Sequence, residues 1–123
     1  MDRLHVYLVR AAFGWMALSG VLHFMADVAS QYIRRTRVPS PETTLYYGLH
    51  SAYAWGHIAF GALALYLVTC TAPVMNERGL LIMGLVVALG WLAIAMGFIE
   101  YWQPKANAVV LCALMVAALL TRY

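Results

Sequence analysis

The feature that most constrains this chain is a series of four long apolar segments with few charged side chains. Hydrophobic residues make up 64% of the 123 residues, and charged residues only 11%. A soluble domain usually carries about 25% charged residues, so this composition indicates a membrane protein. A membrane-spanning helix needs about 20 apolar residues. We therefore expect an all-α integral membrane protein, an up-and-down four-transmembrane-helix bundle with short loops, formed as a single domain by residues 1–123.

Prolines and capping residues mark the expected helix ends. Ser40 suits an N-cap, Pro41 a first helical turn, and Glu42 the positive end of the helix dipole. Pro73 should stop this second helix, and Asn76 is a candidate cap for the third. The pattern predicts helices at about 4–30, 41–71, 77–102 and 105–121. The last is short, and its length leaves open whether it spans the membrane fully.

The basic residues indicate membrane anchoring and do not indicate nucleic-acid binding. The net charge is only +3, and the basic residues flank apolar runs instead of forming a stripe interleaved with exposed aromatic side chains. Four are expected on the side of the termini and four on the other: Arg3, Arg10, Arg78 and Arg122 against Arg34, Arg35, Arg37 and Lys105. This balance leaves the orientation ambiguous under the positive-inside rule, and dual topology remains an alternative. The first segment lacks the cleavage site of a signal peptide, so we expect a retained membrane helix.

Ionisable side chains gather at the same ends of the expected helices. His23 and Asp27 lie at the end of the first helix, His50 and His57 near the beginning of the second, and Glu100 at the end of the third. In an up-and-down bundle these positions meet on one side of the membrane. Ionisable groups at membrane depth are costly and often mark functional sites. The sequence therefore predicts a one-sided polar pocket.

Helical spacing places these groups on two stripes. One stripe contains Ser19, His23 and Asp27, and the other contains Tyr46, His50, Tyr53 and His57. Residues three or four positions apart share a helix face. A carboxylate at Asp27 can orient the imidazole of His23, as in general-base pairs. Gly61 and Ala64 continue the second stripe and favour close helix packing, and we expect His23 and His57 to share the pocket.

This pattern favours acid–base chemistry on a lipophilic small molecule of the quinone, sterol or isoprenoid type. The expected catalytic residues are His23, Asp27, His57 and Glu100; the expected ligand-binding residues are Ser19, Tyr46, His50, Tyr53 and Trp102. Isomerisation or cyclisation by proton transfer requires no cofactor, and none is predicted. Whether the chain is an enzyme or a binding protein stays open.

Two other functions remain open. A haem- or metal-binding subunit of a redox system would use His23, His50 and His57 as ligands, with Asp27 or Glu100 as a carboxylate ligand to a metal. A proton-coupled small dimeric transporter would also suit four helices, although its acid should lie nearer the membrane centre. Membrane lipid, a second copy or a larger membrane complex are the expected partners. Cys70 and Cys112 lie in separate segments and are expected to be packing residues, and His5 is expected to face solvent.

Overall fold

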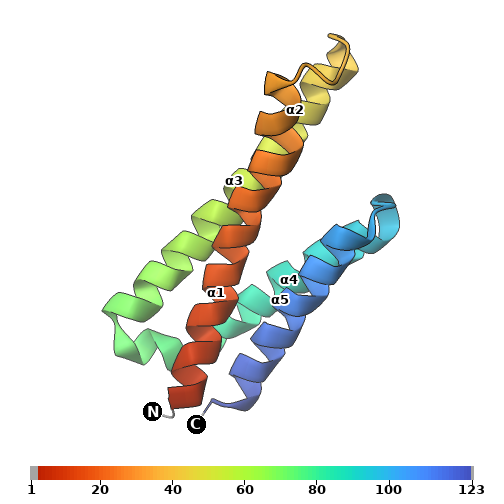
Figure 1. The fold of residues 1–123 in the computed structure, drawn as a ribbon. Helices are drawn as coiled ribbons and strands as arrows, with labels where there is room; N and C mark the ends of the chain where they lie inside the picture. Colours follow the sequence, from red (N-terminus) through yellow and green to blue (C-terminus); the bar gives the residue numbers. More distant parts are fainter. Residues whose placement is uncertain (1–2, 123) are drawn as a thin grey trace.

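The computed structural model describes residues 3–122, and their regular secondary structure is helical throughout. The elements in chain order are α1 (Arg3–His23), the π-helical η1 (Phe24–Ala29), α2 (Ser30–Ile33), α3 (Pro41–Cys70), the 3₁₀-helical η2 (Ala72–Asn76), α4 (Arg78–Phe98) and α5 (Trp102–Leu120). The first three form one continuous rod (Figure 1). Four helical segments are long and apolar enough to cross a membrane. The predicted all-α four-helix bundle is confirmed.

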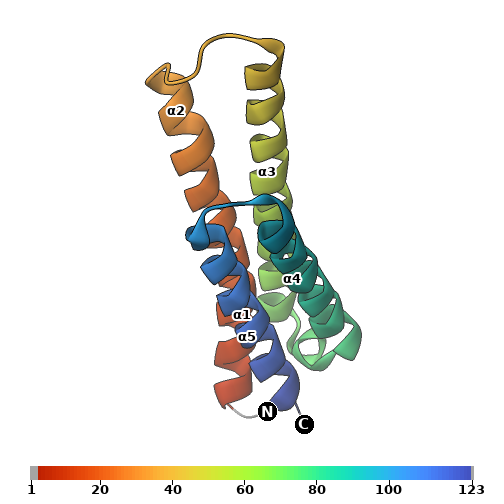
Figure 2. The ribbon, with the colours of Figure 1, turned by 90° about the vertical axis from the view of Figure 1, so that its right-hand side faces the viewer.

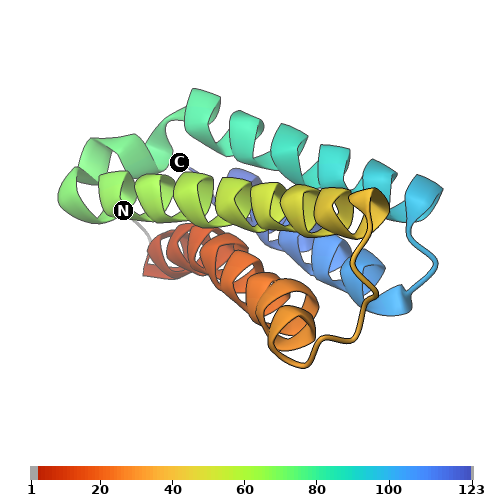
Figure 3. The ribbon, with the colours of Figure 1, turned by 90° about the horizontal axis from the view of Figure 1, so that it is seen from above.

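The helices form two pairs of unequal length. The α1–η1–α2 rod packs along α3, α4 packs along α5, and α5 also contacts α1 (Figures 1 and 3). The rod and α3 extend well beyond the turn that joins α4 to α5 (Figure 2). At 1.5 Å per residue the 31-residue rod is roughly 45 Å long, longer than a hydrocarbon core of ~30 Å. The α4–α5 turn therefore lies beside the middle of the two long helices.

Two glycines set the close approach of α1 and α3. A Cβ atom on Gly61 would lie 2.6 Å from the Ala17 nitrogen and 2.9 Å from the Phe13 carbonyl oxygen. A Cβ atom on Gly20 would lie 2.7 Å from the Ala54 carbonyl oxygen. These neighbours are backbone atoms, so a side chain at either position would push the helices apart. The close packing predicted at Gly61 is confirmed.

The apolar core fills the half of the bundle next to the termini. Its largest fully buried apolar side chains are Phe13, Met16, Leu81, Leu111 and Met115. They come from the middle of α1, the beginning of α4 and the middle and end of α5. The opposite half of the bundle contains the polar aromatic residues described below.

The helix ends near residue 100 differ from the prediction. The fourth element, α4, ends at Phe98 instead of near residue 102, and α5 begins at Trp102 instead of 105. Pro104 thus lies inside the first turn of α5, where the backbone N–H groups have no helical partner and a proline costs little. At the other helix ends, Ser40 accepts the Thr43 N–H at 3.1 Å, as a predicted N-cap does. Asn76 lies in η2 and does not cap α4, so that prediction is wrong.

His5 is buried, and the prediction that it faces solvent is wrong. Its exposed fraction is 1%, and its Nδ1 lies 3.2 Å from the Thr121 hydroxyl. The end of α5 packs against the beginning of α1, which covers a residue that looks like part of a charged helix end in the sequence. This contact joins the first and last helices of the bundle.

Candidate functional site

A hydrogen-bonded chain of three side chains links the two polar stripes. His23 Nδ1 lies 3.0 Å from the Asp27 carboxylate, and His23 Nε2 lies 2.9 Å from His50 Nδ1. A carboxylate accepts, so His23 donates from Nδ1 and accepts at Nε2 from the Nδ1–H of His50. In this arrangement His50 keeps a free lone pair on Nε2. The chain Asp27–His23–His50 therefore has the order of a proton relay with His50 at its end.

Asp27 is held by an irregular turn of the first rod. The π-helical η1 begins directly after His23 and contacts α3. A π-helical turn changes the register of the residues that follow it, and such turns occur frequently at functional sites. The predicted pairing of Asp27 with His23 is present, although the prediction from residue spacing assumed a regular α-helix.

Aromatic rings enclose the two hydrogen-bonded imidazoles. The rings of His23 and His50 are stacked with centroids 5.0 Å apart. Tyr53 contacts His23 edge-on at 4.6 Å, and Tyr46 contacts His50 at 4.0 Å. His23 of α1 contacts both His50 and Tyr53 and so connects the rings of the predicted stripe on α3. This packing holds the imidazoles in fixed orientations.

His57 lies deeper in the bundle than the relay, and the ring of Tyr53 separates it from His23. It is 2% exposed, its ring lies 4.3 Å from that of Tyr53, and its Nδ1 lies 3.3 Å from the Tyr53 carbonyl oxygen. Trp91 of α4 contacts both Tyr53 and His57, at 4.2 Å and 4.8 Å. The structure thus pairs His23 with His50, and Tyr53 stands between this pair and His57.

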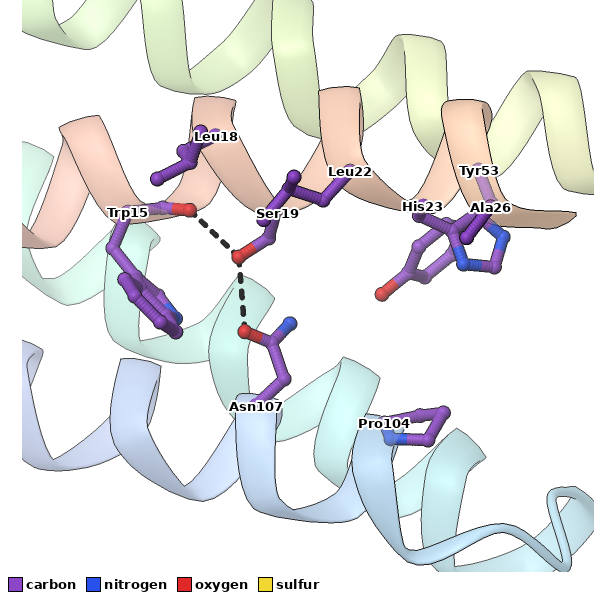
Figure 4. A pocket seen from close by; sticks show the side chains of 9 residues that line it. All are labelled: Trp15, Leu18, Ser19, Leu22, His23, Ala26, Tyr53, Pro104 and Asn107. Atoms are coloured by element: carbon purple, nitrogen blue, oxygen red, sulfur yellow. Dashed lines mark hydrogen bonds between the residues drawn. The ribbon is translucent and has the colours of Figure 1, made fainter. Parts of the chain in front are cut away.

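A cavity of about 260 Å³ opens beside the relay between α1, α3 and α5 (Figure 4). It is lined by Trp15, Leu18, Ser19, Leu22, His23, Ala26, Tyr53, Pro104 and Asn107. A second cavity of about 170 Å³ is lined by His23, Leu49, His50, Tyr53, Ile99 and Pro104. Because His23, Tyr53 and Pro104 line both, the two cavities lie side by side, and we call them together the relay cleft. Their volumes taken together reach the ~300–1,000 Å³ range of small-molecule sites.

The outer wall of the relay cleft is apolar and faces the outside of the bundle. Leu18 and Leu22 are 48% and 57% exposed, and Ala26 is also exposed. If the helices span a membrane, these exposed apolar side chains would contact lipid. The cleft is therefore accessible from the side to a molecule dissolved in the bilayer.

The inner wall carries the predicted Ser19 and also Asn107, which the sequence analysis missed. The Ser19 hydroxyl lies 2.9 Å from the Asn107 Oδ1 and 2.7 Å from the Trp15 carbonyl oxygen. The Trp15 indole nitrogen is buried and has no hydrogen-bond partner among the described residues. Asn107 could have been found in the sequence as an amide inside the last apolar span, where polar side chains are costly.

The remaining predicted site residues lie away from the cleft. Glu100 and Trp102 are exposed at the turn between α4 and α5, and neither lines the cavities described above. Tyr46 lies at the outer side of His50, with the Arg37 guanidinium 3.5 Å from its ring centre. Gln31 donates to the Tyr46 hydroxyl at 3.3 Å and accepts from Arg37 Nε at 3.0 Å. These contacts cover the outer side of His50, on the side of the loop between α2 and α3.

The relay residues also have the spacing of metal ligands. One ligand atom each from His23, Asp27 and His50 can be chosen so that all three lie within 4.8 Å of one another. Two imidazole nitrogens and a carboxylate oxygen suit zinc and other first-row divalent ions. Asp27 was one of the two carboxylate ligands considered from the sequence, and His57 lies outside this group.

No family model, curated protein or solved structure matches this chain. The function is therefore argued from the chemistry of the relay cleft.

Proposed function

We propose that this chain binds a lipophilic small molecule in the relay cleft and moves protons on it without a cofactor. The observation that carries the proposal is the Asp27–His23–His50 chain at the wall of a cleft that is open toward lipid. A buried imidazole with a carboxylate behind it is a common form of general base. Quinones, sterols and isoprenoids are the ligand types that such a cleft would admit.

The relay suggests a specific proton path. A C–H proton of the ligand passes to His50 Nε2, while the Nδ1 proton of His50 passes to His23 Nε2. The positive charge then lies on His23, where the Asp27 carboxylate stabilises it. The electron pair of the broken C–H bond stays on the ligand, and return of the proton to another carbon yields an isomer. No oxidant or reductant is consumed.

The first test asks whether a lipophile occupies the cleft. The chain purified in mild detergent should carry a neutral lipid-soluble molecule that native mass spectrometry and solvent extraction detect. Leu22→Trp, which narrows the lipid-facing opening, should reduce this occupancy severalfold. Leu120→Trp, an exposed substitution at the far end of α5, is the matched control. Equal occupancy in both variants would place the lipophile outside the relay cleft.

A metal site is the second candidate function, favoured by the mutual distances of the relay residues. If the relay binds zinc, the purified protein should contain about one ion per chain, and Co²⁺ should replace it with visible d–d absorption. His23→Ala should abolish binding, because this side chain lies at the centre of the group. A protein that takes up no Zn²⁺ or Co²⁺ at micromolar concentrations would exclude this function and leave the acid–base proposal.

The other two alternatives fit the relay less well. Axial haem ligation requires the macrocycle to lie between two imidazoles, whereas His23 and His50 contact each other directly. Alternating-access transport requires a site reachable from both sides. The relay cleft instead is lined by Ile99 and Pro104 next to the α4–α5 turn, and it opens beside the exposed Leu18 and Leu22.

A further inference from the structure

We infer that the ligand of the relay cleft carries a neutral carbonyl oxygen, bound by Asn107 and Tyr53. This inference rests on the proposed function of the cleft and names the class of its substrate. It is carried by the hydrogen-bonding groups that line the larger cavity. The Asn107 NH₂ group and the Tyr53 hydroxyl have no hydrogen-bond partner among the described residues. The Asn107 Oδ1 and the Trp15 carbonyl oxygen, in contrast, both lie within hydrogen-bond distance of the Ser19 hydroxyl.

The side-chain amide of Asn107 presents its donor face to the cavity. Its Oδ1 lies 2.9 Å from the Ser19 hydroxyl, whose single proton it shares with the Trp15 carbonyl oxygen at 2.7 Å. Figure 4 shows the nitrogen on the opposite side, directed into the space between Ser19, His23 and Pro104. The described residues offer this NH₂ group no hydrogen-bond acceptor, so it is available to a ligand.

Trp15 carries a second donor without a partner on the same side of the cavity. Its indole N–H is buried, and the described residues leave it without an acceptor. A buried donor without a partner is costly because it has lost its hydrogen bonds to water. The side chain lines the cavity next to Asn107. Because protein atoms cover the indole nitrogen, a ligand oxygen would reach it only if the ring turned toward the cavity.

Tyr53 contributes a donor from the opposite wall. Its hydroxyl is directed into the cavity from α3 (Figure 4) and makes no hydrogen bond to the described residues. Both nitrogens of the neighbouring His23 are already occupied by Asp27 and His50. A ligand oxygen in this cavity thus meets donors on two sides, while the relay stands beside them.

The absence of charge in the cavity favours a neutral acceptor. No lysine or arginine is among the described residues that line either cavity, and the Asp27 carboxylate lies directly behind His23. A carboxylate ligand would therefore be buried without a counter-ion. A carbonyl oxygen accepts two hydrogen bonds and needs no acceptor itself. It also acidifies the adjacent C–H bonds, which is the substrate property that the relay requires.

A pair of matched probes tests this inference. The probes are a decyl-substituted cyclohexanone and the corresponding decylcyclohexane, titrated into the full chain in lipid nanodiscs and followed by tryptophan fluorescence. We expect the ketone to bind about tenfold more tightly than the hydrocarbon. Asn107→Leu should remove most of this preference, and Tyr53→Phe should lower it about threefold. Gln103→Leu, which changes an exposed amide on the same helix, should preserve it.

The outcomes separate this inference from the proposed function. Equal binding of both probes, or an unchanged preference in folded Asn107→Leu and Tyr53→Phe, would overturn the carbonyl site while leaving a lipophile-binding cleft. Tighter binding of decanoic acid than of the ketone would also overturn it, because the ligand would then be an anion. Binding of neither probe would contradict both the inference and the proposed function. Circular dichroism establishes that each variant is folded.

Discussion

Replacing Asp27 with asparagine is expected to lower the rate of proton exchange on a bound enone by roughly 10²–10⁴-fold. The asparagine side chain keeps the size of the carboxylate but removes the charge that stabilises a protonated His23. Its NH₂ group can also donate to Nδ1, which reverses the tautomer of His23 and breaks the order of the relay. The measurement is the uptake of deuterium from D₂O into a decyl-substituted cyclohexenone, followed by mass spectrometry.

The matched control is Glu42→Gln, the same loss of charge at the beginning of α3 and outside the cleft. Its exchange rate should equal that of the unaltered protein. Binding of the enone should change little in Asp27→Asn, because Asp27 does not line either cavity. A full exchange rate in Asp27→Asn would contradict the relay, and an equal loss in both variants would show that the effect is not local.

Replacing Gly61 with alanine is expected to destabilise the bundle by about 1–3 kcal/mol, the usual cost of overpacking. The added methyl group would lie 2.6 Å from the Ala17 nitrogen and 2.9 Å from the Phe13 carbonyl oxygen. Both are backbone atoms of α1, so the strain can be relieved only if α1 and α3 separate. Since these helices carry His23 and His50, the same separation should weaken ligand binding. Thermal unfolding in detergent measures the first effect.

Gly56→Ala is the control for this substitution, because it lies on the same helix with no atom within 4 Å of an added Cβ. Alanine is the better helix former by about 1 kcal/mol, so this variant should be neutral or slightly more stable. Destabilisation of Gly56→Ala by the same amount would show that the effect comes from α3 itself. An unchanged midpoint in Gly61→Ala would contradict the close approach of α1 and α3.

Much of the fold follows from short-range patterns. The number of helices comes from the length of the apolar segments, and the beginning of α3 from Ser40 and Pro41. The alignment of Tyr46, His50, Tyr53 and His57 follows from helical periodicity alone, since spacings of three and four stay on one face. These features depend on neighbours in the chain and are therefore visible in the sequence.

The partners across helices could not be predicted in the same way. The pairing of His23 with His50, with Tyr53 standing before His57, depends on how far α1 and α3 slide along each other. That offset is determined by the backbone contacts at Gly20 and Gly61. The π-helical turn after His23 adds a local change of register that residue spacing does not indicate.

The amino-acid sequence by itself determined the membrane-spanning character of the helices and the presence of two polar stripes at one end of the bundle. Only the tertiary structure decided that Asn107 lines the relay cleft, that Glu100 and Trp102 do not, and that His5 is buried. The physical reason is that hydrophobicity and helical period act within a segment. Burial and hydrogen-bond partners instead arise from the rotation and offset of whole helices.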